Sequence, residues 1–248
     1  MESIESGDGA ALPRIGVLGG MGPLATADFL AKLALATPAS RDQDHFPVTV
    51  DSTPQIPDRV AAVEGRGPDP LPALAAAARR LEAAGCAFIA MPCNTAHYWH
   101  PRLAAATALP VLHIVDAVAA ELGTTRRVGL LGTAATMRGD LYQRRAGAAV
   151  TWLVPTPEQI DGLVAPGIAA VKAGEIARAG RLLRCAARKL AAGGAETLVL
   201  ACTEIPLVVR GAEVGVPVID ATAALARRSV EHALALRARR AGDMRVAA

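Results

Sequence analysis

Two cysteines stand in settings where a thiol can exchange a proton with a bound molecule. Cys93, in the segment MPCNTAH, and Cys202, in ACTEIP, each follow a short apolar run typical of a buried strand. A helix that begins just after each cysteine would offer free backbone N–H groups and lower the pKa of the thiol from its usual value of about 8.5. We therefore regard both thiols as candidate reactive groups.

The same two cysteines occupy matching positions of an internal repeat. Residues 85–95 align with residues 194–204, which places Cys93 on Cys202. A lone cysteine at the end of a strand is more often a small apolar residue of the core than a reactive group. Two cysteines at equivalent positions, each closely followed by threonine, favour a functional pair.

Short β-branched runs alternate with Ala-, Leu- and Arg-rich segments of helical period, a pattern typical of parallel βαβ units. The predicted strands are residues 14–19, 47–51, 88–91, 128–131, 150–153 and 197–200. The predicted helices are residues 24–36, 72–84, 136–147, 176–192 and 221–237. We expect an α/β fold of two pseudo-symmetric, doubly wound lobes with parallel sheets. Ligands of such sheets bind outside the carboxyl ends of the strands, so the active site would lie between the lobes.

The chain is long enough for two such lobes. At 248 residues it can form two units of about a hundred residues each. We expect a disordered leader at residues 1–13 and a first lobe of residues 14–116 that is completed by a returning C-terminal helix within residues 221–248. Residues 117–220 would form the second lobe.

Composition and charge exclude several classes of protein. The formal net charge is +3, from 26 basic and 23 acidic residues that form no block of like charge, which argues against a nucleic-acid or membrane partner. No apolar run approaches the roughly 18 residues that span a bilayer, and no signal-peptide pattern is present, so we expect a cytoplasmic protein. The four cysteines show no C-x-x-C spacing and should be reduced thiols, with Cys86 and Cys185 in the core.

A glycine motif offers a different interpretation of the first strand. Residues 20–25 fit the pattern G-x-G-x-x-A of a dinucleotide fingerprint, with Asp42 or Asp44 as the ribose-binding acid, which would indicate a nicotinamide enzyme. Pro23 is better explained as the first residue of the following helix, and only the first lobe has this sequence. We expect this loop to bind a carboxylate of the substrate instead.

Two histidines raise the question of a metal. His97 and His100 follow Cys93 at helical spacing, as zinc ligands can. No second cluster of ligands follows at a recognisable spacing, and a metal would occupy the thiol. We therefore expect no metal site.

Four segments carry a resemblance to a known family. They are residues 19–26 (GGMGPLAT), 54–59 (PQIPDR), 92–97 (PCNTAH) and 202–205 (CTEI). Together they resemble the aspartate/glutamate racemase family, specifically the aspartate racemase-like branch of the Asp/Glu/hydantoin racemase superfamily. The resemblance implies an amino-acid racemase that works without pyridoxal phosphate, metal or another cofactor, and a homodimer.

Carried over to this sequence, the resemblance makes Cys93 and Cys202 the two acid–base groups. It implies a small acidic substrate, namely aspartate, glutamate or a close analogue. The residues that would hold this substrate are Met21, Arg59, Asn94, Thr95, Thr133, Lys172, Thr203 and Glu204. The chain departs from the family at Ala201, where glycine is common, and at residues 52–53, where an asparagine is common.

The chemistry of racemisation explains the need for two thiols. An amino-acid α-hydrogen is weakly acidic, so its removal needs a close base and stabilisation of the resulting carbanion. The planar intermediate must then be protonated on its opposite face, which requires one group on each side. Arg59 could clamp the distal carboxylate through a bidentate contact. Lys172 could bind a carboxylate or could only complement the dipole of its helix.

Two other functions fit the same pattern. A thiol-dependent isomerase or decarboxylase of a small dicarboxylate would use one cysteine as a nucleophile. Facing α/β lobes also form the clefts of non-catalytic small-acid binding proteins. Incorporation of solvent deuterium at the α-carbon distinguishes the three functions.

Overall fold

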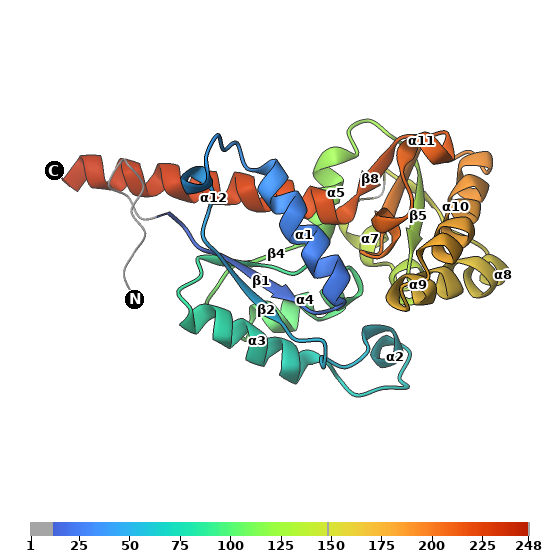
Figure 1. The fold of residues 1–248 in the computed structure, drawn as a ribbon, viewed down its shortest axis with the longest axis horizontal. Coiled ribbons are helices and arrows are strands. Elements are labelled where there is room, and N and C mark those ends of the chain that lie inside the picture. Colours follow the sequence, from blue (N-terminus) through green and yellow to red (C-terminus); the bar gives the residue numbers. More distant parts are fainter. Residues whose placement is uncertain (1–11, 148, 248) are drawn as a thin grey trace.

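Two parallel sheets of four strands each form the framework of the computed structural model, which describes residues 12–147 and 149–247 (Figure 1). The first sheet has the order β2-β1-β3-β4, with β1 at Ile15–Gly19, β2 at Val48–Ser52, β3 at Phe88–Ala90 and β4 at Val111–Leu112. The second has the order β6-β5-β7-β8, with β5 at Arg127–Gly132, β6 at Thr151–Leu153, β7 at Thr197–Ala201 and β8 at Val218–Asp220. The two orders correspond strand by strand, which confirms the predicted α/β fold of two similar parallel-sheet lobes.

Helices flank both sheets. In Figure 1, α1 and α12 lie on one side of the first sheet and α3 lies on the other. The helices of the first half are α1 (Pro23–Ala36), α2 (Arg59–Val63), α3 (Leu71–Ala83), α4 (His100–Ala104) and α5 (Ile114–Glu121). Those of the second half are α6 (Ala134–Arg138), α7 (Leu141–Arg145), α8 (Pro157–Gln159), α9 (Ala165–Lys172), α10 (Ile176–Ala192), α11 (Gly211–Val214) and α12 (Ala221–Ala247).

The inner strands are buried along most of their length. Every residue of β1, β3 and β7 is buried, which explains why these segments are continuously apolar in the sequence. All strand pairs are parallel, and Ile15 of β1 lies opposite Val48 on one side and Phe88 on the other. Parallel pairing brings the carboxyl ends of neighbouring strands to one edge of each sheet, where the loops can form a common site.

Some elements differ from the prediction for physical reasons. Strands β4 and β8, of two and three residues, were not predicted; each lies at the edge of its sheet and is only partly buried, so it lacks the long apolar run of an inner strand. The helix predicted at residues 136–147 is two helices, α6 and α7, because Asp140 between them takes a left-handed φ of 56°. Gly139 is required before this turn, since an added Cβ would lie 1.5 Å from the Tyr98 hydroxyl.

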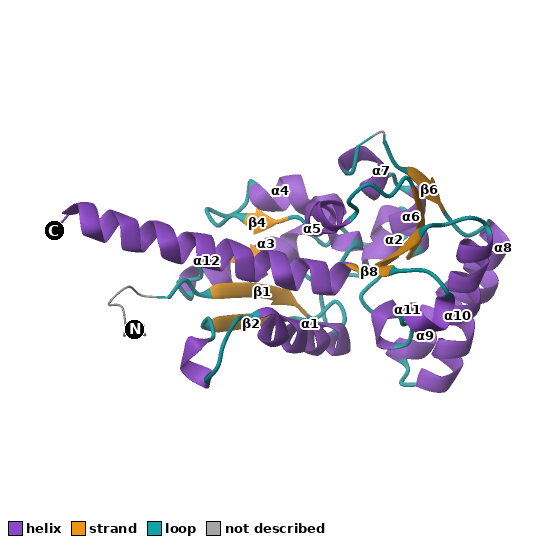
Figure 2. Ribbon diagram, turned by 90° about the horizontal axis from the view of Figure 1, so that it is seen from above, coloured by secondary structure: helices purple, strands orange, loops and turns teal. Residues whose placement is uncertain are grey.

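The last helix links the two lobes. Helix α12 follows β8 of the second sheet but packs against α1 and α5, along the first lobe (Figure 2). Leu225 and Val230 of α12 belong to the same core cluster as Phe29 of α1. Lys32 of α1 forms an ion pair with Asp220 at the start of α12, at 2.6 Å. Helix α12 thus packs along the first lobe, and the division of the chain into lobes stays a prediction.

The structure differs from the prediction near both ends of the described chain. Of the predicted leader, residues 1–11 lie outside the described part, whereas Leu12 and Pro13 are buried and Leu12 packs into the core. The last helix reaches Ala247, beyond the predicted end at residue 237. Among the described residues, no helix is both long enough and apolar enough to cross a membrane.

Candidate active site

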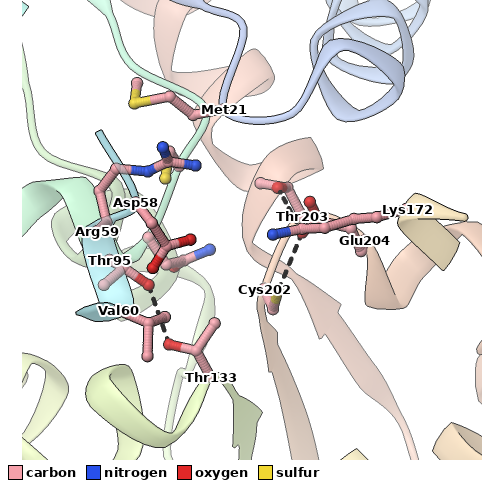
Figure 3. Close-up of a pocket in the computed structure, with 12 residues that line it drawn as sticks. Met21, Asp58, Arg59, Val60, Thr95, Thr133, Lys172, Cys202, Thr203 and Glu204 are labelled. Carbon is pink, nitrogen blue, oxygen red and sulfur yellow. Dashed lines mark hydrogen bonds between the residues drawn. The ribbon is translucent and has the colours of Figure 1, made fainter. Parts of the chain in front are cut away.

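Cys93 and Cys202 follow equivalent strands and line the same pocket. Cys202 comes directly after β7, Cys93 follows shortly after β3, and the two residues are only 5% and 6% exposed, respectively. The pocket is narrow and is formed by both lobes (Figure 3). Asp58 and Val60 also line it. The lining includes every residue that the resemblance assigns to substrate, namely Met21, Arg59, Asn94, Thr95, Thr133, Lys172, Thr203 and Glu204.

The surroundings of both thiols raise their pKa values. Burial is the main cause of the raised pKa at Cys93, and the charge of Arg59 opposes it. At Cys202, burial and the carboxylate of Glu204 together raise the pKa well above its usual value, and the charge of Lys172 opposes them. The prediction of lowered thiol pKa values is therefore wrong for the free protein.

The reason lies in the structure that follows each cysteine. A short 3-10 turn at Thr95–Trp99 follows Cys93, and another at Ile205–Leu207 follows Cys202, where the sequence had suggested helix starts. Such turns lack the aligned peptide dipoles of a longer α-helix, so they stabilise a thiolate less. Desolvation of the buried sulfur atoms outweighs their effect.

Glu204 is bonded to the thiol of Cys202. Cys202 Sγ donates a hydrogen bond to Glu204 Oε2 at 3.0 Å, and Thr203 Oγ1 donates to the same oxygen at 3.2 Å (Figure 3). Glu204 is only 6% exposed. A buried carboxylate that accepts two hydrogen bonds favours the protonated form of the thiol, so Cys202 holds a proton in the free protein.

Arg59 enters the pocket from the first lobe. Asp58 caps helix α2 by accepting a hydrogen bond from the Ala61 N–H at 2.7 Å, and Arg59 is the first residue of that helix. Its Nη1 donates to the carbonyl oxygens of Ile56 and Pro57 at 2.9 and 3.0 Å, which holds the guanidinium in place. Arg59 Nε is buried and has no hydrogen-bond partner within the described residues. A donor therefore remains free for an anion.

Lys172 reaches the pocket from the second lobe. It ends helix α9, and the chain leaves the helix through Gly174, whose positive φ of 78° is typical of a glycine just after a helix. Figure 3 shows the side chains of Arg59 and Lys172 extending into the pocket from opposite sides. Two cationic side chains thus face a space lined by the two thiols.

Asn94 and Thr95 are held by residues of the opposite lobe. The Tyr142 hydroxyl donates to Asn94 Oδ1 at 2.6 Å. The hydroxyls of Thr95, Thr133 and Thr136 lie 3.0 Å from one another, so they form a closed triangle across the lobe boundary. These contacts fix the floor of the pocket between the two sheets.

The glycine loop after β1 shapes the pocket wall. Gly20 has a φ of 90°, and an added Cβ would lie 2.5 Å from the backbone of Thr53, so only glycine fits there. Met21 beside it is buried and lines the pocket. The acids proposed for a nicotinamide ribose lie in the turn Asp42–Asp44, before β2 and thus at the wrong end of that strand. The dinucleotide interpretation is therefore wrong in its geometry.

The histidines near Cys93 have structural partners. His97 Nδ1 lies 2.9 Å from the Cys93 carbonyl oxygen, and its Nε2 accepts from the Ile114 N–H at 3.2 Å. His100 Nε2 lies 2.8 Å from the Val111 carbonyl oxygen. Burial lowers the pKa of His97 to about 4. Both rings thus hold backbone segments next to the pocket.

Sequence reasoning missed four residues of the site and misplaced one cysteine. Asp58 could have been found, because an acidic residue just before a short helical segment is a typical N-cap. Val60, Thr136 and Tyr142 carry no local signal. Cys185, predicted in the core, is only half-buried on the surface of α10, whereas Cys86 is buried as expected.

Comparison with known proteins agrees with this geometry. A model of the Asp/Glu/Hydantoin racemase family matches residues 18–228. The broad specificity amino-acid racemase RacX of Bacillus subtilis (strain 168) is 29% identical over 231 residues, which cover 89% of this chain and 98% of the relative.

Solved structures give the same result. The aspartate racemase of Picrophilus torridus is 30% identical and superposes with a TM-score of 0.82 over 89% of this chain and 94% of that chain. An aspartate racemase homologue from Pyrococcus horikoshii OT3 is 27% identical, with a TM-score of 0.70 over 90% of this chain and 99% of that chain. The chain therefore belongs to the Asp/Glu/hydantoin racemase family.

Proposed function

We propose that this chain is an amino-acid racemase that inverts the α-carbon of aspartate, glutamate or a close acidic analogue by a two-thiol mechanism. The observation that carries the proposal is that two buried thiols, Cys93 from the first lobe and Cys202 from the second, line one small pocket. Inversion needs one proton-transferring group for each face of the α-carbon. The scheme requires neither pyridoxal phosphate nor a metal ion.

The neighbours of the two thiols support different starting roles. Cys202 donates a hydrogen bond to Glu204 and starts as the acid. Burial raises the pKa of Cys93 as well, but the Arg59 charge opposes that shift, so Cys93 is assigned as the thiol that loses its proton first. For one enantiomer, the Cys93 thiolate takes the α-hydrogen and Cys202 gives its proton to the opposite face, which leaves a Cys202 thiolate. The roles reverse for the other enantiomer, and the total charge of the thiol pair is unchanged.

The charged lining supports an acidic substrate. Arg59 and Lys172 supply two positive charges for two carboxylates, and Asp58 and Glu204 supply negative charge for the ammonium group. The pocket is narrow and its lining is mostly polar or charged, which suits a small amino acid better than a bulky apolar ligand. RacX, the Bacillus relative, is named for broad specificity, so the preference for acidic side chains rests here on Arg59 and Lys172.

We further propose that the protein acts as a cytoplasmic homodimer without nucleic-acid or membrane partners. The four free cysteines support a reducing compartment. The homodimer is proposed from the family resemblance. Light scattering on the purified protein measures the molar mass in solution and tests it directly.

The decisive experiment is a panel of amino-acid enantiomers incubated with the protein in deuterated water. Proton NMR reports α-hydrogen exchange, and chiral chromatography reports inversion. We expect exchange together with inversion for aspartate or glutamate. Product formation without inversion would indicate an isomerase or decarboxylase, and binding without exchange would indicate a small-acid binding protein.

A further inference from the structure

A tyrosine outside the pocket lining, Tyr142, is bonded to the side chain of Asn94, which lines the pocket. The Tyr142 hydroxyl lies 2.6 Å from Asn94 Oδ1, and both residues are buried, at 0% and 3% exposure. Asn94 lines the pocket, yet its Nδ2 is buried and has no hydrogen-bond partner among the residues that the structure describes. The amide therefore has its oxygen occupied and its nitrogen free.

The direction of the hydrogen bond follows from what the tyrosine needs. A buried hydroxyl that finds no acceptor loses stability, and Asn94 Oδ1 is the acceptor that the described structure provides. The Tyr142 ring packs edge-on against Trp152, with ring centroids 5.5 Å apart, so the hydroxyl cannot swing away easily. Burial also raises the pKa of Tyr142, which keeps the hydroxyl protonated as a donor.

We propose that Tyr142 is a positioning residue that fixes Asn94 Nδ2 as a hydrogen-bond donor toward a carboxylate group of the bound amino acid. This inference rests on the proposed function, since it names how that pocket recognises its substrate class. Arg59 Nε is the second buried donor of the pocket without a partner within the described chain. Two unpaired donors in one small pocket fit an anionic ligand and do not fit an ammonium group.

The bond also crosses between the lobes. Asn94 follows β3 of the first sheet, while Tyr142 belongs to α7 of the second lobe. The donor toward the carboxylate is therefore correctly oriented only while the two lobes are in contact. The Tyr142 hydroxyl thus links the orientation of a pocket donor to the contact between the lobes.

The test compares Tyr142→Phe with Tyr98→Phe. Both changes remove one hydroxyl that bonds across the lobes, because the Tyr98 hydroxyl donates to the Ala135 carbonyl oxygen at 2.9 Å, but Tyr98 does not bond to Asn94. We expect Tyr142→Phe to raise KM for the acidic substrate about five- to tenfold, with a smaller change in kcat. Tyr98→Phe should leave KM at the parental value. Equal changes of KM in the two variants would overturn the inference.

A double-mutant cycle tests whether Tyr142 acts through Asn94. In the Asn94→Ala background the substitution Tyr142→Phe should cause no further rise in KM, because the group it positions is absent. A full additional effect of Tyr142→Phe in that background would show that the tyrosine acts by another route.

The substitution Asn94→Asp tests the direction of the amide, and it remains available if Tyr142→Phe does not fold. The aspartate still accepts from Tyr142 but presents an oxygen to the pocket, so KM should rise at least as much as in Asn94→Ala. Parental or tighter binding by Asn94→Asp would mean that the pocket receives an acceptor and would refute the inference.

Failure of the proposed function can be distinguished from failure of this inference. Calorimetric titration with succinate measures dicarboxylate binding without any turnover. If the parent protein binds succinate but exchanges no α-hydrogen, the racemase proposal fails while the order of affinities among the variants still tests Tyr142. If the parent racemises and Tyr142→Phe binds succinate as tightly as the parent, only the inference fails.

Discussion

The thiol of Cys202 donates a 3.0 Å hydrogen bond to Glu204 Oε2, inside a pocket that must also receive the carboxylates of an acidic substrate. The resemblance placed Glu204 among the residues that hold substrate, but in the structure its carboxylate accepts hydrogen bonds from its neighbours Cys202 and Thr203. A carboxylate in that position keeps the proton on Cys202. Lys172 supplies positive charge on the same side of the pocket (Figure 3).

Replacing Glu204 with glutamine should make Cys202 more acidic. Glutamine can still bond the sulfur but carries no negative charge, so the thiolate is less disfavoured and the pKa of Cys202 falls. We expect the midpoint of its alkylation by iodoacetamide, followed by peptide mass spectrometry across a pH series, to move down by about one pH unit or more. Glu213→Gln, an exposed carboxylate on α11, is the control and should leave the midpoint in place. An unchanged midpoint in Glu204→Gln would contradict the conclusion that the Glu204 carboxylate raises the pKa of Cys202.

Each cysteine should serve one enantiomer. In Cys93→Ala, Cys202 can still remove the α-hydrogen that points toward it, but it can return the proton only to the same face. Racemisation should then fall by several orders of magnitude, while slow exchange with retention continues for one enantiomer. Cys202→Ala should show the opposite preference.

The buried thiol of Cys86 is the control for this pair. Cys86 lies outside the pocket, so Cys86→Ala should racemise at nearly the parental rate. Exchange is read by NMR in deuterated water and inversion by chiral chromatography. Two single variants that exchange the same enantiomer, or one that still inverts both, would replace the two-base mechanism with a one-base or nucleophilic one.

Arg59→Lys should weaken acidic substrates far more than neutral ones. Lysine keeps the charge but loses the planar fork that binds a carboxylate through two hydrogen bonds. We expect kcat/KM for aspartate or glutamate to fall about ten- to a hundredfold, because a charge-assisted bond contributes about 1.5 to 3 kcal/mol. Arg66→Lys changes an exposed arginine shortly after α2 and should have no effect. Equal losses for acidic and neutral amino acids would remove Arg59 from side-chain recognition.

Acid should destabilise the fold through His97. Because burial holds the pKa of His97 at about 4, the unfolded chain binds a proton below pH 6.5 that the folded chain rejects until about pH 4. The contribution of neutral His97 to the free energy of unfolding is therefore complete above pH 6.5. It is lost as the pH falls from 6.5 to 4, and the loss is about 3 kcal/mol at most. The rings of His100 and His113 and the charge of Arg145 act on the same group.

Urea denaturation at pH 7.5, 5.5 and 4.5 measures this loss. His97→Asn should be less stable than the parent at pH 7.5 but should lose less on acidification. His45→Asn changes a partly exposed histidine that is not in contact with His97, so this variant should keep the parental pH dependence of stability. If the free energy of unfolding of His97→Asn fell with pH as steeply as that of the parent, the acid sensitivity would arise from other residues.

The strand ends that carry the two cysteines could be predicted, because each apolar run and the polar motif after it recur in both halves of the sequence. The environment of the thiols could not. Glu204 is two residues from Cys202, but spacing in the sequence does not tell whether two side chains in a turn face each other. Tyr142 and Asn94 are 48 residues apart and meet only because the lobes are docked.

Helix α12 has a consequence for how the chain is made. Its buried residues, including Leu225 and Val230, complete a core that also contains Phe29 of α1 and Val115 of α5, yet they are synthesised only after the whole second lobe. During translation, the apolar faces of α1 and α5 therefore stay exposed to solvent until the second lobe and then α12 have been synthesised. Contacts so distant in the sequence slow folding and leave apolar surface open to aggregation until they form. The packing of α12 against α1 and α5 is therefore the step that completes the core of the first lobe.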